Sequence, residues 1–179
     1  LTVDTSLFPA SFQTALLAAL SNDHDLDEAT DGLLIHSDNF QALNLLQARY
    51  RGQVKCIYID PPYNTGNDGF IYKDGYQKSS WATLIHSRLS VAKNLLNQSG
   101  VIFQSIDDNE QARLKLLSDG IFGEQNFVSE LTIIVKPEGR RYGHFAKTHE
   151  FAYVYSKNSN YLTLNEILAE GAEHKYFDG

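Results

Sequence analysis

The sequence lacks methionine altogether and has only one cysteine, one tryptophan and four prolines in 179 residues. A single thiol excludes a disulfide within the chain, and Cys56 stands in an apolar run that predicts a small buried side chain. No apolar run approaches the ~18 residues of a membrane span, so none is predicted. No basic region followed by an apolar stretch opens the chain, so no secretory signal is expected. One cysteine is consistent with a reducing compartment, and we expect a cytoplasmic protein without membrane contact.

Leu1 is not an initiator methionine, which leads us to expect a piece of a longer protein. The length predicts one domain, and the net charge of −7 argues against a surface that binds nucleic acid all over. Basic side chains are nevertheless concentrated in one segment, at Lys136, Arg140, Arg141, His144, Lys147 and His149. Charge alone leaves two interpretations open, a loop that faces phosphates and a solvated loop.

The first part of the chain alternates helix and strand patterns. Residues 9–20 are rich in helix formers and predict a helix. A short strand is predicted at 33–36, followed by a helix over 39–49 that Asp38 can cap. The β-branched and aromatic residues of 54–59 predict a buried strand. Strand, helix and strand in about thirty residues match the size of a βαβ unit.

The same alternation returns downstream and predicts the fold class. An amphipathic helix is expected from Ser79 or Ser80 to Leu96, with Trp81 in the core and Gly100 closing the helix. Further elements are a strand at 101–106, a helix that Asp107 or Asp108 caps, and strands at 128–135 and 151–155. We therefore expect an α/β fold with a mostly parallel sheet, flanking helices and an antiparallel edge pair near the C-terminal end.

Residues 60–66 read Asp-Pro-Pro-Tyr-Asn-Thr-Gly and directly follow the strand predicted at 54–59. Open α/β sheets bind their ligands at the carboxyl ends of the strands. A carboxylate such as Asp60 and a rigid carbonyl such as that of Pro61 can accept both N–H bonds of an exocyclic base amine, which frees the nitrogen lone pair for attack on a methyl group. A plain strand end with a proline turn is the alternative for a bare Asp-Pro-Pro, but the longer string favours a reaction centre.

The string from Ile57 to Gly66 resembles the catalytic segment of β-class adenine-N6 DNA methyltransferases, in particular the modification (Mod) subunits of type III restriction–modification systems. The likeness continues in order through Ser37-Asp38-Asn39, Arg88-Leu89, residues 122–127 and residues 149–157, and covers roughly residues 32–158. Ser37 stands where the family usually has glycine. The resemblance implies a Rossmann-like methyltransferase sheet, S-adenosylmethionine as methyl donor and DNA as substrate.

The resemblance also implies catalytic roles for four residues. Asp60 accepts a hydrogen bond from the adenine amine and lies near the amino group of the cofactor. Pro61 contributes its carbonyl from the backbone that it and Pro62 hold rigid. Tyr63 stacks on the flipped base. The reaction is an in-line displacement at the sulfonium methyl, accelerated mainly by alignment and fixed dipoles.

Cofactor and DNA contacts follow from the same resemblance. Asp38 and Asn39 are expected beside the adenosine part of the cofactor, although a helix cap explains Asp38 equally well. DNA contacts, mostly to phosphates, are expected from Tyr63, Asn64, Lys136, Arg140, Arg141 and Lys147. His144 and His149 have no Cys or His partner at metal spacing, so no metal site is predicted.

The sequence contains no glycine-rich turn of the kind that holds the methionine end of the cofactor. That turn follows the target-recognition domain in the permuted class, so we expect an incomplete sheet that by itself binds S-adenosylmethionine weakly or not at all. The expected division is an N-terminal helix and acidic loop at 1–31, a catalytic part at 32–158, and the start of the target-recognition region or a linker at 159–179.

The expected partners are DNA, a second modification subunit and a restriction helicase–nuclease subunit. Two other functions compete with adenine methylation. One is N4-cytosine methylation, which Asp60 disfavours because Ser-Pro-Pro-Tyr is commoner there. The other is a non-catalytic module that binds DNA or a partner subunit.

Overall fold

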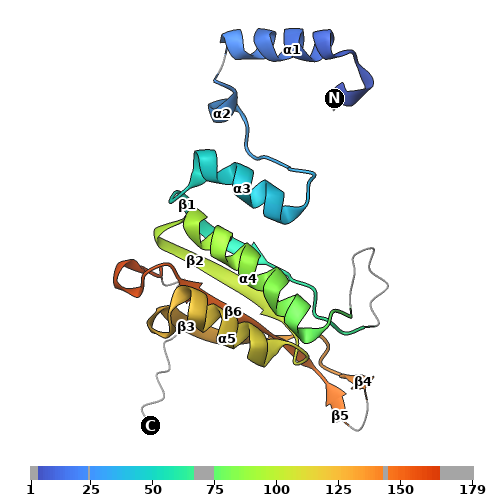
Figure 1. Cartoon of the computed structure of the whole chain (residues 1–179), viewed down its shortest axis with the longest axis vertical. Helices are drawn as coiled ribbons and strands as arrows, with labels where there is room; N and C mark the ends of the chain where they lie inside the picture. Colours follow the sequence, from blue (N-terminus) through green and yellow to red (C-terminus); the bar gives the residue numbers. More distant parts are fainter. Residues whose placement is uncertain (1–3, 24, 67–74, 143–144, 166–179) are drawn as a thin grey trace, which may run out of the picture. The chain divides into compact units, whose positions relative to one another are not determined.

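The computed structural model describes residues 4–23, 25–66, 75–142 and 145–165, in two units, Leu1–Ser37 and Asp38–Gly179 (Figure 1). The first unit contains the 3-10 turn η1 at Thr5–Leu7, helix α1 at Ala10–Asp23 and the one-turn helix α2 at Leu26–Ala29. Helix α1 confirms the helix predicted at 9–20. Its first turn is closed by the Pro9 carbonyl, which accepts hydrogen bonds from the amides of Phe12 and Gln13.

The strand predicted at residues 33–36 is wrong. These residues pair with no strand in the part of the chain that the structure describes, and the Leu34 side chain is 97% exposed. A run of apolar residues becomes a strand only where a neighbouring strand pairs with its backbone, and the local pattern cannot show whether that neighbour exists.

The second unit is built on a four-stranded sheet in the order β1-β2-β6-β3. Strand β1 at Val54–Ile59 pairs in parallel with β2 at Leu96–Ile106. Strand β6 at His149–Ser156 runs antiparallel to β2 on one side and to β3, Phe127–Ile134, on the other. Three of the four strands therefore share one direction, and the antiparallel pair with β3 at the edge is confirmed. The α/β fold with flanking helices is confirmed, but the sheet is mixed, because only the β1–β2 pairing is parallel and β6 is antiparallel to both of its neighbours.

Three helices accompany the sheet: α3 at Asn39–Tyr50, α4 at Lys78–Leu95 and α5 at Gln111–Phe122. Helix α3 packs on α4, and α4 packs on α5 alongside the sheet (Figure 1). Strand β1, helix α4 and strand β2 form the parallel βαβ connection, so this unit begins at β1 and not at residues 33–36. The smaller elements are the 3-10 turns η2 at Glu124–Asn126 and η3 at Ser159–Tyr161, and a hairpin of β4 at Arg140–Tyr142 with β5 at Phe145–Lys147.

Both predicted ends of α4 need correction. Helix α4 starts at Lys78 after Gln77, which makes no side-chain capping bond, so Ser79 and Ser80 lie inside the first turn instead of capping it. Gly100 does not close α4, because the chain enters β2 directly at Leu96 and Gly100 lies within that strand. A Cβ on Gly100 would come 2.8 Å from the carbonyl oxygen of Val54, so the close approach of β1 requires glycine there.

The core lies between the sheet and the helices α4 and α5. It contains Trp81, Ile85, Leu89, Leu96, Ile102, Ile106, Leu114, Phe122, Tyr153 and Tyr155. Trp81 is completely buried, which confirms its predicted place in the core. Full burial of each large side chain contributes about 1.5–3 kcal/mol. This packing fixes the carboxyl ends of β1 and β2, where the 60–66 segment lies.

Cys56 is exposed, and the prediction of a buried thiol is wrong. Alternate residues of a strand point to opposite faces, and the face of β1 that carries Ile57 and Ile59 packs on the core. Cys56 and Tyr58 point the other way, and the Tyr58 side chain is 66% exposed. Among the described helices, none is long and apolar enough to cross a lipid bilayer.

Candidate active site

The segment after β1 presents one exposed carboxylate on a half-buried backbone. Strand β1 ends at Ile59 because the two prolines have no N–H to continue the ladder. Asp60 is exposed, while Pro61, Pro62, Tyr63 and Asn64 are partly buried. Asp60 therefore lies at the carboxyl end of a strand, with the following residues seated against the fold behind it.

Three consecutive residues of this segment are held by three different elements. The indole Nε1 of Trp81, in α4, donates to the carbonyl oxygen of Pro62 at 2.8 Å. The hydroxyl of Tyr63 donates to Oε2 of Glu150, in β6, at 3.3 Å. Asn64 Nδ2 donates to Oε1 of Glu110 at 2.7 Å. The backbone after Asp60 is thus tied to α4, to β6 and to the turn before α5.

Tyr63 differs in one respect from the exposed ring that base stacking suggests. Its ring packs partly against the core. Burial raises the pKa of Tyr63 well above its ordinary range, and the nearby charges of Asp60 and Glu150 raise it further. The hydroxyl therefore stays protonated near neutral pH and serves as a hydrogen-bond donor. Stacking of Tyr63 on a flipped base stays a prediction.

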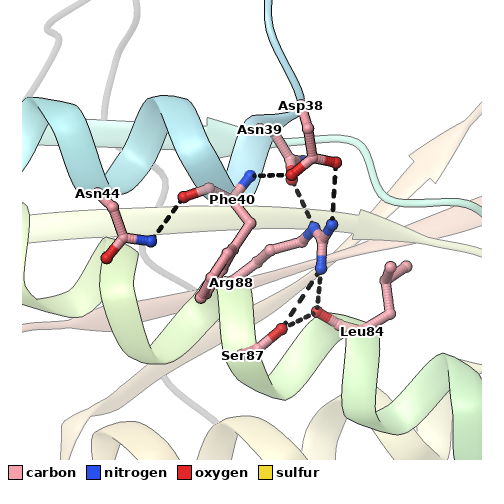
Figure 2. A network of polar contacts seen from close by, with 7 residues as sticks. All are labelled: Asp38, Asn39, Phe40, Asn44, Leu84, Ser87 and Arg88. Atoms are coloured by element: carbon pink, nitrogen blue, oxygen red, sulfur yellow. Dashed lines mark hydrogen bonds and ion pairs between the residues drawn. The ribbon is translucent and has the colours of Figure 1, made fainter.

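Asp38 and Asn39 belong to a separate group of contacts around Arg88 (Figure 2). Asp38 caps α3 by accepting from the amide of Phe40 at 3.0 Å, which confirms the predicted cap. Its second oxygen pairs with the Arg88 guanidinium at 3.3 Å, and Arg88 Nε donates to the Asn39 side-chain oxygen. Arg88 in turn donates to the Leu84 carbonyl, so it joins the start of α3 to the middle of α4.

The basic segment forms the β4–β5 hairpin between β3 and β6. Arg140 and Arg141 lie in β4, and Arg140 is paired across the ladder with Lys147 in β5. Lys136 is exposed, and Lys147 makes an ion pair with Asp108 that joins the hairpin to the turn after β2. Among the described residues, no three His, Cys, Asp or Glu side chains gather in a way that could hold a metal ion.

A family model described as DNA methylase matches residues 54–176, from the start of β1 through the 60–66 segment and the rest of the sheet. The chain belongs to the DNA methylase family. The expected family resemblance is therefore confirmed, and the matched region contains the string that begins at Asp60.

Curated relatives of this DNA methylase include modification subunits of type III restriction–modification enzymes. The probable HindVI Mod subunit of Haemophilus influenzae is 45% identical over 148 residues, which cover 80% of this chain and 20% of that protein. The EcoPI Mod subunit of Escherichia phage P1 is 36% identical over 184 residues, 85% of this chain and 28% of that protein. The chain thus spans between a fifth and three tenths of the length of these relatives.

A solved structure shares the fold of this DNA methylase. The crystal structure of the M1.HpyAVI–SAM complex superposes with a TM-score of 0.50 at 15% sequence identity, covering 78% of this chain and 60% of that one. At this identity the likeness supports the methyltransferase fold alone.

Sequence reasoning assigned no role to Glu110 or Glu150, the carboxylates that hold Asn64 and Tyr63. The sequence predicts Asp107 or Asp108 as the cap of the helix that follows, and this prediction is wrong, because α5 begins at Gln111 after Glu110. Asp107 instead accepts from the Asn109 amide in the turn before α5. The position of Glu110 near the 60–66 segment could have been predicted from the sequence, because neighbouring parallel strands end at the same edge of a sheet. Residues that follow β2 are therefore expected beside those that follow β1.

Proposed function

We propose that the protein is an S-adenosylmethionine-dependent DNA adenine-N6 methyltransferase and the modification subunit of a type III restriction–modification system. The observation that carries the proposal is the exposed Asp60 carboxylate at the end of β1, backed by a segment whose next residues are anchored. Family membership and relatives named as type III Mod subunits support the same function.

In this proposal Asp60 and the Pro61 carbonyl accept the two N–H bonds of the target amine. The Trp81 indole already donates to the Pro62 carbonyl. In this proposal the Pro61 carbonyl therefore binds the substrate, while the Pro62 carbonyl binds the fold. The two prolines fix the Pro61 carbonyl before the substrate arrives, and such a preorganised dipole lowers the barrier without further rearrangement. Tyr63 offers its ring to the flipped base, and its hydroxyl bond to Glu150 ties the end of the side chain to β6.

S-adenosylmethionine, when bound, supplies an electrophilic methyl group on sulfur. Asp38, Asn39 and Asp60 are the residues proposed to contact it. The Asp38 side chain is 55% exposed, and each of its oxygens makes one hydrogen bond or ion pair in the described structure. Each oxygen therefore keeps a lone pair for a hydroxyl donor, which fits a contact with ribose.

The DNA duplex is proposed to lie along the basic hairpin, with phosphate contacts from Lys136, Arg140, Arg141 and Lys147 and further contacts from Tyr63 and Asn64. A second modification subunit and a restriction helicase–nuclease subunit are the proposed protein partners, in the cytoplasm. Residues 1–31, 32–158 and 159–179 are proposed as an N-terminal segment, the catalytic part and the start of target recognition or a linker.

The test measures modified nucleosides in DNA from cells that express the full-length protein or its Asp60→Ala variant. We expect N6-methyladenine with the unaltered protein and none with Asp60→Ala, because the amine loses its charged acceptor. Asp31→Ala removes an exposed carboxylate of the first unit and is the matched control, with unchanged methylation expected.

N4-methylcytosine in place of N6-methyladenine would establish the alternative chemistry. No methylated base from any of the proteins would indicate a non-catalytic module. Turnover retained in Asp60→Ala would remove Asp60 from the mechanism.

A further inference from the structure

Asn64 has an unusual backbone conformation directly after the catalytic string. Its φ is +59°, and no other residue except glycine has a positive φ in the described part of the chain. Asparagine visits this left-handed region more readily than most residues, but it stays there only when the surroundings hold it. The conformation turns the chain sharply after Tyr63, so it sets the direction from which Asp60 to Tyr63 leave the strand.

The surroundings hold Asn64 through its side-chain amide. Nδ2 donates to Glu110 Oε1 at 2.7 Å and to the carbonyl oxygen of Tyr76 at 3.1 Å. Glu110 is only 3% exposed, and its other oxygen accepts from Arg113 at 2.6 Å. A buried carboxylate is tolerated only where charged or polar partners form hydrogen bonds or ion pairs with it, and Asn64 and Arg113 are such partners of Glu110.

The placement of Glu110 links two strand ends. It follows β2 and is the residue before α5, where its side chain makes no capping bond to a backbone amide of that helix. One carboxylate oxygen accepts instead from the Arg113 side chain in α5, and the other accepts from Asn64 in the segment after β1. A residue that served only to start α5 would bond to the free amides of that helix.

We propose that Glu110 is a positioning residue for methyl transfer, which holds Asn64 in its left-handed conformation and thereby aligns Asp60, Pro61 and Tyr63. The inference rests on the proposed function. Glu110 is proposed to act through Asn64 and not through contact with the substrate. Its loss would therefore disturb the alignment of the acceptors more than the binding of DNA or cofactor, and misplacement of reacting groups by about 1 Å can cost a hundredfold in rate.

The first experiment compares Glu110→Ala with Arg113→Ala in the full-length protein. Both variants break the same ion pair, but only Glu110→Ala removes the acceptor of Asn64. We expect kcat to fall about 10- to 100-fold in Glu110→Ala with KM for DNA and S-adenosylmethionine within about threefold. Arg113→Ala should keep kcat within about threefold of the unaltered protein.

Two further variants separate positioning from general stability. Glu110→Gln keeps an oxygen acceptor for Asn64 and should restore most of the rate. Asn64→Gly adopts the positive φ freely but lacks the amide, so it should lower kcat by itself and leave Glu110→Ala little further effect. Additive losses in the Asn64→Gly/Glu110→Ala double variant would overturn the proposal.

A readout that needs no activity completes the test. Hydrogen exchange of the backbone amides at 63–66 should accelerate in Glu110→Ala and stay unchanged in Arg113→Ala. Unchanged exchange and unchanged kcat in Glu110→Ala would overturn the positioning role while Asp60→Ala still tests the proposed function. If the unaltered protein methylates no base, the proposed function fails, and exchange still decides whether Glu110 holds Asn64.

Discussion

At the scale of single residues, the candidate site depends on donors and acceptors far away in the chain. The carbonyl of Pro62 and the side-chain NH2 of Asn64 are polar groups on a partly buried turn, and each has a specific partner, Trp81 and Glu110 respectively. Buried polar groups without partners are costly, so these bonds decide which backbone conformation the turn can keep. The rigidity of the site is therefore a property of its hydrogen bonds as well as of its prolines.

Trp81 provides a direct test of that statement. Trp81→Phe keeps an aromatic ring in the core but removes the N–H that bonds to Pro62. We expect a loss of about 1–3 kcal/mol in the free energy of unfolding, because the hydrogen bond disappears and the ring is smaller. Urea unfolding followed by circular dichroism measures it, because Trp81 is the only tryptophan and its fluorescence disappears with the substitution.

Tyr58→Phe is the matched control for Trp81→Phe. It also removes one side-chain hydrogen bond, between the hydroxyls of Tyr58 and Ser105, but on an exposed part of β1. Its effect should stay within about 0.5 kcal/mol. An equally small effect of Trp81→Phe would contradict the anchoring of Pro62.

At the scale of elements, those fixed by local sequence features were predicted correctly, and those that depend on contacts with distant residues were not. The bounds of β1 matched the prediction because a β-branched run and two prolines are both local features. The start of α4 was missed because serines within a first turn resemble caps, and the strand at 33–36 was wrong because pairing is not local. The roles of Glu110 and Glu150 were not predicted for the same reason, since only the adjacency of strands brings these residues to the 60–66 segment.

The contact of α5 with β6 should make stability depend on pH. Asp119 in α5 accepts from Lys115 at 2.6 Å and from the hydroxyl of Tyr155 in β6 at 2.7 Å. Burial by itself would raise the pKa of Asp119, but the hydrogen bonds from Lys115 and Tyr155 and the charge of Lys115 outweigh it and lower the pKa. A carboxylate with a lowered pKa stabilises the fold above its unfolded pKa of about 3.9, and that contribution disappears as the pH falls through the folded value.

We therefore expect Asp119→Asn to be less stable than the unaltered protein at pH 7 and to lose less stability between about pH 5 and pH 2. Urea unfolding at a series of pH values measures both slopes. Glu138→Gln changes an exposed carboxylate of the same unit and should leave the profile unaltered. A parallel acid profile for Asp119→Asn would show that the contact between α5 and β6 is not electrostatic in origin.

At the scale of the whole molecule, charge is distributed so that a chain of net charge −7 can still meet a polyanion. Several cations outside the hairpin are engaged within the fold. Lys115 pairs with Asp119, Arg113 pairs with Glu110, and Lys157 donates to the carbonyl of Lys93. The segment from Lys136 to Lys147 is thus the part of the sequence where basic residues are concentrated and are least balanced by acidic ones. We expect the proposed attraction for DNA to arise there.

The proposed DNA contact can be tested through the salt dependence of binding. Removal of one phosphate contact reduces the slope of log K against log salt by about 0.9 in B-DNA. Arg140→Ala/Arg141→Ala should therefore lower the slope by about 1.8 and weaken binding to specific and random duplexes alike, because phosphate contacts carry no sequence information. Fluorescence anisotropy of the full-length protein between about 50 and 200 mM salt measures both quantities.

Lys55→Ala, on β1, is the control and should keep the slope. Weakening confined to one duplex sequence would assign these arginines to base recognition, and an unchanged slope would place the DNA elsewhere on the molecule.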